Sequence, residues 1–399
     1  MFQNHLVQDL IPFWNKLRDD TFGGFYGYVD GNGKPDPKRE KGVILNSRIL
    51  WFYSSAYLLL RDPQLLGMAE HAYRFMVEHC VDGRYGGVFW SVHYDGSVYD
   101  DTKHCYNQAF AIYALSAYYR ASGDKAALNQ AYELYRIIES KCKDAGGYLE
   151  AFHRDFTPAG NDKLSENGVL ASRTMNTLLH VLEAYTELYR ADSFDRIGDS
   201  IREILHCFKN KIYDSDKKMC QVFFDEVYHS LIDLDSYGHD IEASWLLDRA
   251  CEVLADDVCS REMQPVIDGL AEGALEHAID TGLIAMNNEC ENGIVSTRKI
   301  WWVQAEAVIG FYNAYEHHRE QPEYRALSEH IWEFIQKYVI DGSTREWIEE
   351  IEDVSSIDRS QALVHPWKCP YHNGRMCMEM FTRLENNNPG VTRDRREFV

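Results

Sequence analysis

The sequence has no excess of positive charge and no apolar run long enough to cross a lipid bilayer. Its 399 residues include 41 Lys and Arg against 63 Asp and Glu, which gives a formal net charge of −22. Such a surface repels phosphate groups, so we expect neither nucleic acid nor a membrane as a partner. A membrane-spanning helix needs about 20 consecutive apolar residues, and the start, MFQNHLVQDLIPFW, does not have the basic and apolar segments of a signal peptide.

Paired cysteines and several catalytic motifs are also missing. None of the ten cysteines is spaced as CxxC, so we expect reduced, buried thiols in a cytoplasmic protein rather than disulfides or zinc ligands. No GxxxxGK(S/T) or GxGxxG phosphate loop occurs, and no Ser or Cys lies in a nucleophile elbow. Aromatic residues are abundant, with 25 Tyr, 18 Phe and 9 Trp. Sugar-binding clefts and ordinary cores both use such rings, so composition alone leaves the two open.

The chain contains an internal repeat that is marked by pairs of glycines. Gly-Gly occurs at 23–24, 86–87 and 146–147, in steps of 63 and 60 residues. Weaker counterparts, rich in glycine, aromatic residues or alternating polarity, follow at 219–229, 280–293 and 341–353. Each of these six segments is typical of a short β-hairpin or loop. Self-similarity at a fixed period of this length indicates a repeat architecture.

Pairs of amphipathic helical segments lie between these loops. The predicted helices are 3–18, 43–61, 64–80, 104–121, 124–140, 170–191, 194–211, 239–255, 259–279, 299–317, 322–339 and 372–384. Twelve helices in six consecutive hairpins predict an all-α fold, an (α/α)6 barrel, with the β-hairpin loops at one end; an open α-solenoid is the alternative. No linker divides the pattern, so we expect one catalytic domain over 1–385 and a disordered tail over 386–399.

The two helices of each pair differ in polarity. Second helices such as GVILNSRILWFYSSAYLLL are apolar on nearly all sides, whereas first helices such as DKAALNQAYELYRIIESKCKD carry more charge. A helix that is apolar all round is buried. We therefore expect the second helix of every pair to face the barrel axis and the first to face solvent.

Polar and aromatic residues interrupt the predicted inner helices near their N-terminal ends. Because alternate helices of a barrel run parallel, these ends share one mouth, and the interrupting residues should converge on one cleft. Buried polar groups are unfavourable unless paired, so such a cluster in an apolar funnel is a candidate binding site. The interrupting residues are Asn46, Arg48, Tyr106, Asn107, Arg173, Asn176, His180, His239, Glu242, Trp245, Trp301, Trp302, Glu306, Trp367, His372 and Arg375.

Each of these residues also has a purely structural interpretation. His180 suits a hydrogen-bonded histidine of the core, and His239 suits a helix cap. Arg48 and Glu306 could form an ion pair, and Trp302 could be a core ring. What favours a site is that every inner helix departs from the apolar pattern at the same end.

The three histidines permit two kinds of chemistry. His180, His239 and His372 could hold zinc as neutral imidazoles, but no HxH or HExxH motif supports this, and we expect no metal. Histidine also exchanges protons near neutral pH, so two imidazoles on opposite walls could remove a proton beside a carbonyl and replace it from the other face. Glu242, one turn after His239, is placed to orient that imidazole, and Arg48 could stabilise an enediolate oxygen. Three tryptophans could stack on sugar rings: Trp245, Trp302 and Trp367.

Six segments in order resemble a known family. They are NSRILWFYS, YNQAFAIYALS, TMNTLLHVLEAYTELY, SYGHDIEASWLLDRA, WWVQAEAVIGF and PWKCPYHNGRMCMEM. Over the chain up to about residue 385 they resemble the N-acylglucosamine 2-epimerase superfamily, most closely its cellobiose or mannobiose 2-epimerases.

The resemblance implies an (α/α)6 barrel that epimerises C2 of the reducing-end sugar of β-1,4-linked disaccharides without a cofactor. Cellobiose would become glucosyl-mannose, lactose would become epilactose, and mannobiose would become mannosyl-glucose. The resemblance implies that each reaction proceeds by proton transfer through a cis-enediolate. The resemblance assigns catalysis to His239 and His372, with His180 as a third active-site histidine and Arg48 beside the enediolate. It assigns substrate binding to Tyr106, Asn176, Glu242, Trp245, Trp302, Glu306 and Trp367.

Three rival functions remain open at this point. A monosaccharide isomerase or epimerase, acting on mannose or an N-acylmannosamine, belongs to the same superfamily. A glycoside hydrolase can use the same fold, with Glu242 and Glu306 as the two carboxylates that hydrolysis requires. The third is a non-catalytic sugar-binding or scaffold protein. For the epimerase we expect an oligosaccharide or sugar as the substrate and a monomer or weak homodimer.

Overall fold

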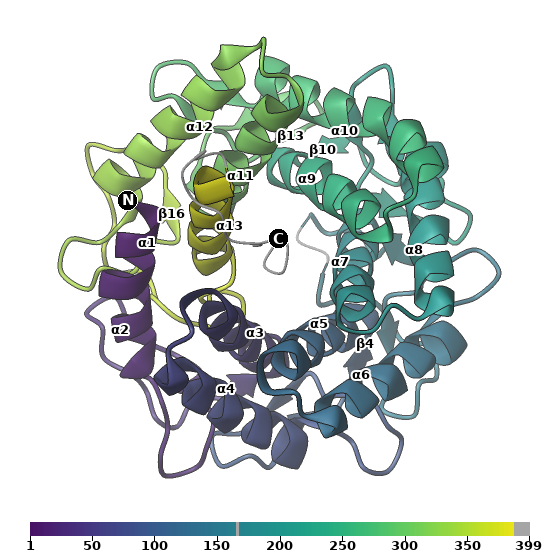
Figure 1. Ribbon diagram of the computed structural model, residues 1–399, viewed down its shortest axis with the longest axis vertical. Coiled ribbons are helices and arrows are strands. Elements are labelled where there is room, and N and C mark those ends of the chain that lie inside the picture. The colour runs from purple at the N-terminus through teal and green to yellow at the C-terminus, as the bar shows by residue number, and fades with distance from the viewer. Residues whose placement is uncertain (165–166, 387–399) are drawn as a thin grey trace.

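The computed structural model describes residues 1–164 and 167–386, which form two concentric rings of helices (Figure 1). Successive inner helices contact one another around the ring, and the last contacts the first, so the barrel is closed and the open solenoid is excluded. The inner helices are α3 (Val43–Leu60), α5 (Cys105–Ser122), α7 (Met175–Ala191), α9 (Tyr237–Leu254), α11 (Trp301–His317) and α13 (His372–Asn386). The predicted (α/α)6 barrel and the predicted choice of inner helices are confirmed.

The outer ring carries the amphipathic helices, and N-terminal aspartates begin several of them. The carboxylates of Asp62, Asp124 and Asp256 accept hydrogen bonds from backbone N–H groups of α4, α6 and α10, which satisfies donors that a helix start leaves free. The outer helices are α1 (Phe2–His5), α2 (Ile11–Asn15), α4 (Pro63–Phe75), α6 (Lys125–Ile137), α8 (Asp195–Cys207), α10 (Asp257–His277) and α12 (Pro322–Phe334). Single π-helical turns join α1 to α2 or extend the outer helices at Leu6–Leu10, Met76–Cys80, Ile138–Cys142, Phe208–Ile212 and Ile335–Val339.

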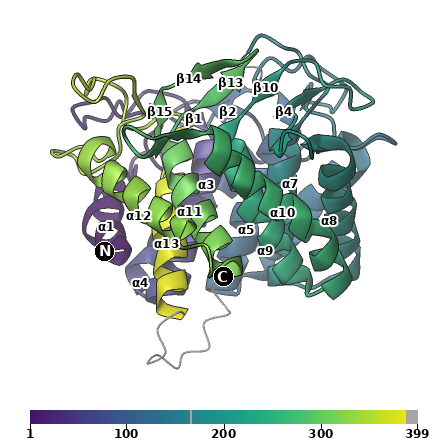
Figure 2. The ribbon, with the colours of Figure 1, turned by 90° about the horizontal axis from the view of Figure 1, so that it is seen from above.

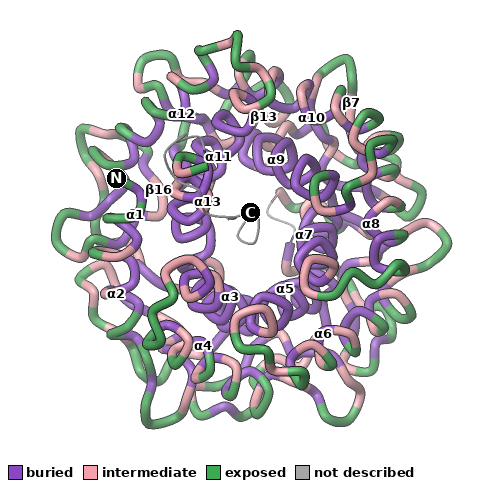
Figure 3. Tube along the Cα trace, viewed as in Figure 1, coloured by how far each residue is buried: buried purple, intermediate pink, exposed green. Residues whose placement is uncertain are grey.

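Burial follows the two rings (Figure 3), because the inner helices are buried on nearly every side and the outer ones only on the side toward them. Within the described residues one helix, α3, is long and apolar enough to cross a membrane, but 78% of it is buried inside the protein. All ten cysteines are free, and eight of them are buried, as expected from their apolar neighbours. The main hydrophobic core includes residues from Phe2 to Met380. Almost all of the tail predicted at 386–399 lies outside the described residues.

Short antiparallel strands gather at one end of the barrel (Figure 2), where the sequence predicts the hairpin loops. The strand before each of five inner helices pairs with the loop of the following repeat, so the loops brace one another around the mouth. These pairs are β1 (Lys41–Gly42) with β2 (Ser91–Val92), β4 (Lys103–His104) with β5 (Ala151–Phe152), β6 (Arg173–Thr174) with β9 (Phe223–Phe224), β10 (Leu234–Asp235) with β13 (Glu289–Glu291), and β15 (Lys299–Ile300) with β16 (Glu350–Ile351). The remaining strands are β3 (Val98–Asp100), β7 (Tyr213–Asp214), β8 (Met219–Cys220), β11 (Ile279–Asp280), β12 (Ala285–Met286) and β14 (Ile294–Ser296).

The helix predicted over 170–191 starts five residues late. Arg173 and Thr174 are extended and pair with Phe224 and Phe223. The hydroxyl of Thr174 then accepts the backbone N–H of Thr177, which fixes the start of α7 at Met175.

Gly310 lets α11 approach α9 closely, and this contact sets the positions of two walls of the mouth. A Cβ at Gly310 would lie 2.5 Å from Cγ1 of Ile241 and 2.7 Å from its carbonyl oxygen. Gly310→Ala is therefore expected to destabilise the fold by about 1–3 kcal/mol through overpacking. A Cβ at Gly67 on α4 would meet no atom of the described chain within 4 Å, so Gly67→Ala should stabilise slightly, by about 0.5–1 kcal/mol. Urea unfolding of both variants checks the opposite signs; equal effects would contradict the packing explanation.

Candidate active site

The N-terminal ends of the inner helices surround a cavity of about 310 Å³ at the strand-bearing end of the barrel. Nine of the eleven residues that the family resemblance assigns to the site line it: Arg48, Tyr106, Asn176, His180, His239, Glu242, Trp302, Trp367 and His372. The other two, Trp245 and Glu306, are buried behind the wall. The structure therefore brings nine of these eleven residues to one cavity.

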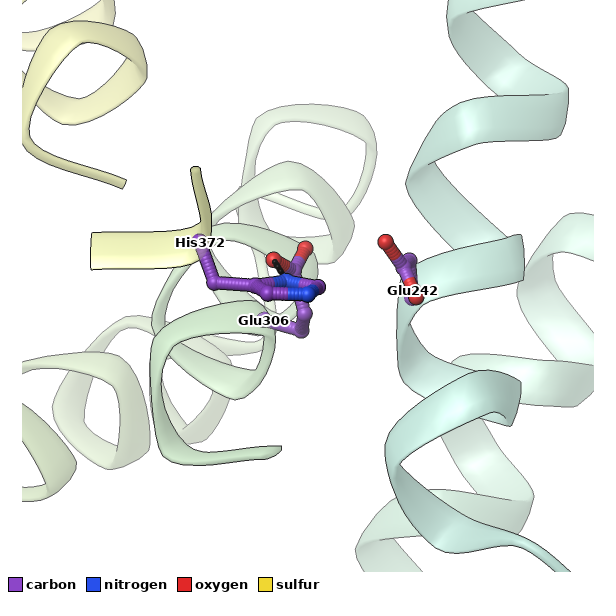
Figure 4. A group of neighbouring side chains, drawn as sticks. All are labelled: Glu242, Glu306 and His372. Atoms are coloured by element: carbon purple, nitrogen blue, oxygen red, sulfur yellow. Dashed lines mark hydrogen bonds and ion pairs between the residues drawn. The ribbon is translucent and has the colours of Figure 1, made fainter. Parts of the chain in front are cut away.

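His372 and Glu306 form a buried pair on α13 and α11. The Nδ1 atom of His372 lies 2.7 Å from Oε1 of Glu306, and Trp245 donates its indole N–H to Oε2 at 3.1 Å. Figure 4 shows the imidazole beside Glu306, with Glu242 facing it from α9. Since Nδ1 is engaged with the carboxyl group, the other ring nitrogen, Nε2, is the one left for the substrate.

Burial shifts the pKa values of Glu306 and His372 in opposite directions. It raises the pKa of Glu306 to about 8, although the guanidinium of Arg375 opposes the shift. Burial, then Arg375 and Arg48, lower the pKa of His372 well below its usual value. The pair therefore titrates as a unit. When the pair carries an extra proton, Nε2–H of His372 can act as an acid. When the pair has lost that proton, Nε2 of His372 can act as a base.

His239 has a different environment on the facing wall. Its Nδ1 lies 2.7 Å from the hydroxyl of Ser236, and burial lowers its pKa to about 4, so the ring is neutral at neutral pH. The ring of Trp302 contacts both histidines, with centroid distances of 4.8 Å to His239 and 5.5 Å to His372. Two imidazoles with different proton affinities thus contact one indole.

The expectation that Glu242 orients His239 is wrong. Glu242 directs Oε1 at the guanidinium of Arg375 instead, and Ser236 takes the Nδ1 position of His239. The reason is that Arg375 offers a charge-assisted bond inside the barrel, which outweighs a contact to a neutral ring. The alternative pairing of Arg48 with Glu306 is not formed either, since Glu306 binds His372 and Arg375.

His180 repeats the histidine–carboxylate arrangement on α7. Its Nδ1 lies 2.9 Å from Oε2 of Glu183, and the hydroxyl of Tyr371 donates to the same carboxylate at 2.6 Å. Burial alone would raise the pKa of Glu183, but Arg375 and His180 together hold it at about 2. Glu183 is therefore ionised throughout the neutral range.

Arg48 lies on the wall formed by α3. Its guanidinium donates to the hydroxyl of Tyr106 at 2.9 Å and to the carbonyl of Trp367 at 3.3 Å. It also stacks over the rings of Phe110 and Tyr371, at 4.2 and 4.6 Å. A buried cation that lines the cavity is suited to stabilise negative charge on a bound substrate.

Several buried polar atoms in the described cavity wall have no hydrogen-bond partner in the protein. They are Nε of Arg48, Oδ1 of Asn176, Oε2 of Glu242 and Nε1 of Trp301. Buried polar atoms are nearly always satisfied, so these four are the natural contacts for hydroxyl groups of a ligand.

The donors that come close enough for a metal are not the three histidines. Within the described part of the chain the compact group is Glu242, Glu306 and His372, whose ligand atoms lie within 4.8 Å of one another. The guanidinium of Arg375 already binds both carboxylates. A metal cation would meet a fixed positive charge there, so the donor set does not fit a metal ion.

Three of the polar interruptions serve the barrel rather than the site. Asn46 and Asn107 donate to the backbone carbonyls of Gly42 and Phe89. Arg173 pairs with Asp144, 2.7 Å away. Each of these three residues bonds to a group in or beside a loop, and none of them lines the cavity.

Sequence reasoning assigned no role to Glu183, Tyr371, Ser236 or Arg375. Two signals were present: Glu183 follows His180 by three residues, so the two share a helix face, and Ser236 directly precedes the helix that carries His239. The contacts of Arg375 come from three other helices and have no local signature.

Comparisons with known proteins agree with this geometry. The family model for N-acylglucosamine 2-epimerase (GlcNAc 2-epimerase) matches residues 24–373. The chain is 47% identical over 382 residues to a Ruminococcus albus protein named cellobiose 2-epimerase, covering 96% of this chain and 97% of that protein. It is 48% identical over 392 residues to a cellobiose 2-epimerase of Eubacterium cellulosolvens, covering 94% and 96%.

A solved structure is similar over almost its whole length. It is a crystal structure of a sugar epimerase from a ruminal bacterium, with a TM-score of 0.93 at 46% identity, covering 96% of this chain and 98% of that one. These likenesses span the barrel and every wall of the cavity. The chain therefore belongs to the N-acylglucosamine 2-epimerase family and is a carbohydrate epimerase, an enzyme of the isomerase class.

Proposed function

We propose that the protein epimerises C2 of the reducing-end sugar of β-1,4-linked disaccharides such as cellobiose, lactose and mannobiose. The relatives named cellobiose 2-epimerase, at 47–48% identity over nearly the whole chain, support the substrate class. The cavity of about 310 Å³ is within the size range of small-molecule sites. The chemistry requires only proton transfer, so the proposal includes no cofactor.

The observation that carries the proposal is the pair of imidazoles, from α9 and α13, that line one cavity and both contact Trp302. After the sugar ring opens, C2 is adjacent to the C1 aldehyde and its proton is acidic. One histidine removes this proton to give a cis-enediolate, the C2–C3 bond rotates, and the other histidine delivers a proton to the opposite face. The proton lost from C2 by one base is thus replaced by a proton from the other, and no net redox change occurs.

The environments of the two histidines suit these roles at neutral pH. His239, with its pKa near 4, is the neutral base for one epimer, while the protonated pair of His372 and Glu306 is the acid. The roles reverse for the other epimer, as a reversible reaction requires. Arg48 lies on the same cavity and stabilises the negative oxygen of the enediolate.

The hydrolase alternative has less support. Glu242 and Glu306 both bind the guanidinium of Arg375, and Glu306 is fully buried behind His372. A hydrolase needs one carboxyl on each side of the scissile bond with access to it. The two histidines would also have no task in hydrolysis.

A product analysis by NMR tests the proposed function. Purified protein is incubated separately with cellobiose, lactose, mannobiose, mannose and N-acetylmannosamine. We expect the C2 epimer of each disaccharide to form faster than any product from the monosaccharides. Conversion of mannose or N-acetylmannosamine alone would favour the monosaccharide enzyme, release of glucose from cellobiose would favour the hydrolase, and no product from any sugar would contradict catalysis on this class.

The two pKa values predict a bell-shaped pH profile. Below the pKa of His239, about 4, the base is protonated and kcat/KM falls; above that of the His372–Glu306 pair, about 8, the acid is lost and kcat/KM falls again. Measuring kcat/KM from pH 3.5 to 10 with cellobiose should place the limbs near those values. Glu306→Gln should remove the alkaline limb, and an unchanged limb in that variant would contradict the assignment.

A further inference from the structure

Arg375 lies beneath the floor of the active-site cavity. It is 1% exposed and does not line that cavity. Together with Glu183 and Trp245 it lines a second, smaller cavity of about 70 Å³. The wall of this second cavity also includes Arg120 and Arg249 from the C-terminal halves of α5 and α9. Arg375 therefore lies between the active-site cavity and the lower part of the barrel, and it is not exposed in the active-site cavity.

One guanidinium group holds three carboxylates from three helices. Nη1 of Arg375 donates to Glu183 of α7 and to the hydroxyl of Tyr371, while Nη2 donates to Glu242 of α9 and lies 2.8 Å from Glu306 of α11. The group is stacked over Tyr371 at 4.2 Å, which fixes its plane. A planar fork with five donors can serve several carboxylates at once, whereas the ammonium of lysine is a single point charge.

Two of these carboxylates are the partners of histidines in the cavity. Glu183 binds Nδ1 of His180 at 2.9 Å, and Glu306 binds Nδ1 of His372 at 2.7 Å. The position of each imidazole therefore depends on a carboxylate that Arg375 fixes from below. The histidine that lacks such a connection is His239, whose Nδ1 partner is Ser236.

We propose that Arg375 is a positioning residue of the reaction, which fixes His180 and His372 together through Glu183 and Glu306. The role of His372 in proton transfer rests on the proposed function. Loss of the guanidinium frees both carboxylates to turn, so both imidazoles lose their orientation at once. It also removes the positive charge that faces the His372–Glu306 pair, so this pair holds its proton to higher pH.

The charged and titratable groups that face His372 come from α3, α7, α9 and α11, and from the chain around His372 itself. They are Arg48 from α3, His180 from α7, His239 and Glu242 from α9, Glu306 from α11, and Tyr371 and Arg375 beside it. Among these groups, Arg375 is the one that contacts the three carboxylates of Glu183, Glu242 and Glu306.

The test compares Arg375→Lys and Arg375→Ala with Arg249→Lys. Arg249 is also a buried arginine of the barrel, which binds Glu379 with both terminal nitrogens, at 3.2 and 3.0 Å. Supporting groups of this kind are worth about 10- to 100-fold. We therefore expect kcat to fall about 10- to 100-fold in Arg375→Lys and further in Arg375→Ala, with KM little changed. Arg375→Ala, which loses the positive charge, should also move the alkaline limb to higher pH, whereas Arg375→Lys keeps the charge and should leave the limb near its wild-type position. Arg249→Lys should change the melting temperature alone.

Chemical rescue of kcat distinguishes a positioning role of Arg375 from a merely structural one. Arg375→Ala opens a space continuous with the second cavity, and free guanidinium ion from guanidinium chloride should enter it and restore part of kcat. Sodium chloride at equal concentration is the control. If both Arg375 variants keep the wild-type kcat and pH profile, or lose only stability as Arg249→Lys does, the positioning role is overturned.

A measurement without turnover separates this inference from the proposed function. Nitrogen-15 NMR of labelled histidines reports which ring nitrogen carries the proton, with His180→Gln and His372→Gln used for assignment. We expect Nδ1 of His180 to be protonated in the wild-type protein and mixed tautomers in Arg375→Lys. If the histidine tautomers are unchanged in Arg375→Lys, the role of Arg375 is overturned even if the protein epimerises sugars. If the protein epimerises no sugar, the proposed function fails, and the tautomer change alone decides whether Arg375 positions the two histidines.

Discussion

His372→Ala is expected to lower kcat for C2 epimerisation by about 10²- to 10⁴-fold, because a positioned acid–base group typically contributes that much. The fold should survive, since Glu306 keeps its bonds to Arg375 and Trp245. Steady-state rates with cellobiose and a thermal melt measure the two effects. Normal turnover in this variant would remove His372 from the chemistry, and a collapsed melting transition would point to a structural role instead.

The same variant is expected to exchange protons without epimerising. With His239 intact, the C2 proton of the epimer that faces it can still be removed and returned to the same face. In heavy water His372→Ala should therefore place deuterium at C2 of one epimer, and His239→Ala should do so with the other. NMR of each recovered sugar identifies which face each histidine serves. Deuterium in the same epimer with both variants would contradict the opposed-wall arrangement.

Arg48→Ala is expected to lower kcat by about 100- to 1000-fold, the cost of losing one donor to a developing oxyanion. The guanidinium lines the cavity and is held over Phe110 and Tyr371, so it is in place before negative charge forms. The effect should appear mainly in kcat, because the charge develops in the transition state. Arg48→Lys should recover part of the loss. A rise in KM with unchanged kcat would show that Arg48 only binds substrate.

The barrel itself could be predicted from the sequence, because both its repeat period and its inner ring of helices have local signals in the sequence. The six glycine- or aromatic-rich loops give the period, and the apolar second helices give the inner ring. The late start of α7 is the exception, since nothing between 170 and 174 reveals that Arg173 and Thr174 pair with Phe224 and Phe223. Strand pairs of two residues depend on neighbours about 50 residues away and have no periodicity of their own.

Nine of the residues that line the cavity could be predicted, but their hydrogen bonds and ion pairs could not. Polar residues at the start of six parallel helices must converge, which placed Arg48, His239 and His372 around one cavity. The partner of each side chain depends on which helices face each other across the axis. Glu242 lies one turn from His239, yet it binds Arg375 of α13, because the fold places a guanidinium within its reach.

The burial and the pKa of Glu306 could not be predicted from the sequence either. From the sequence it could equally bind a sugar hydroxyl, pair with Arg48 or act as a hydrolytic acid. Its complete burial between Trp245, His372 and Arg375 excludes direct contact with solvent and raises its pKa. Both facts follow from side chains on α9 and α13, which are remote in the sequence.

Deuterium incorporation at C2 tests the central claim most directly. The wild-type protein is incubated with cellobiose in heavy water, and the C2 epimer is isolated and analysed by NMR. Proton abstraction and return by His239 and His372 predict deuterium at C2 of the product, because the proton that reaches the second face comes from an imidazole that exchanges with solvent. A product that retains the original hydrogen at C2 would contradict two-base proton transfer at this site.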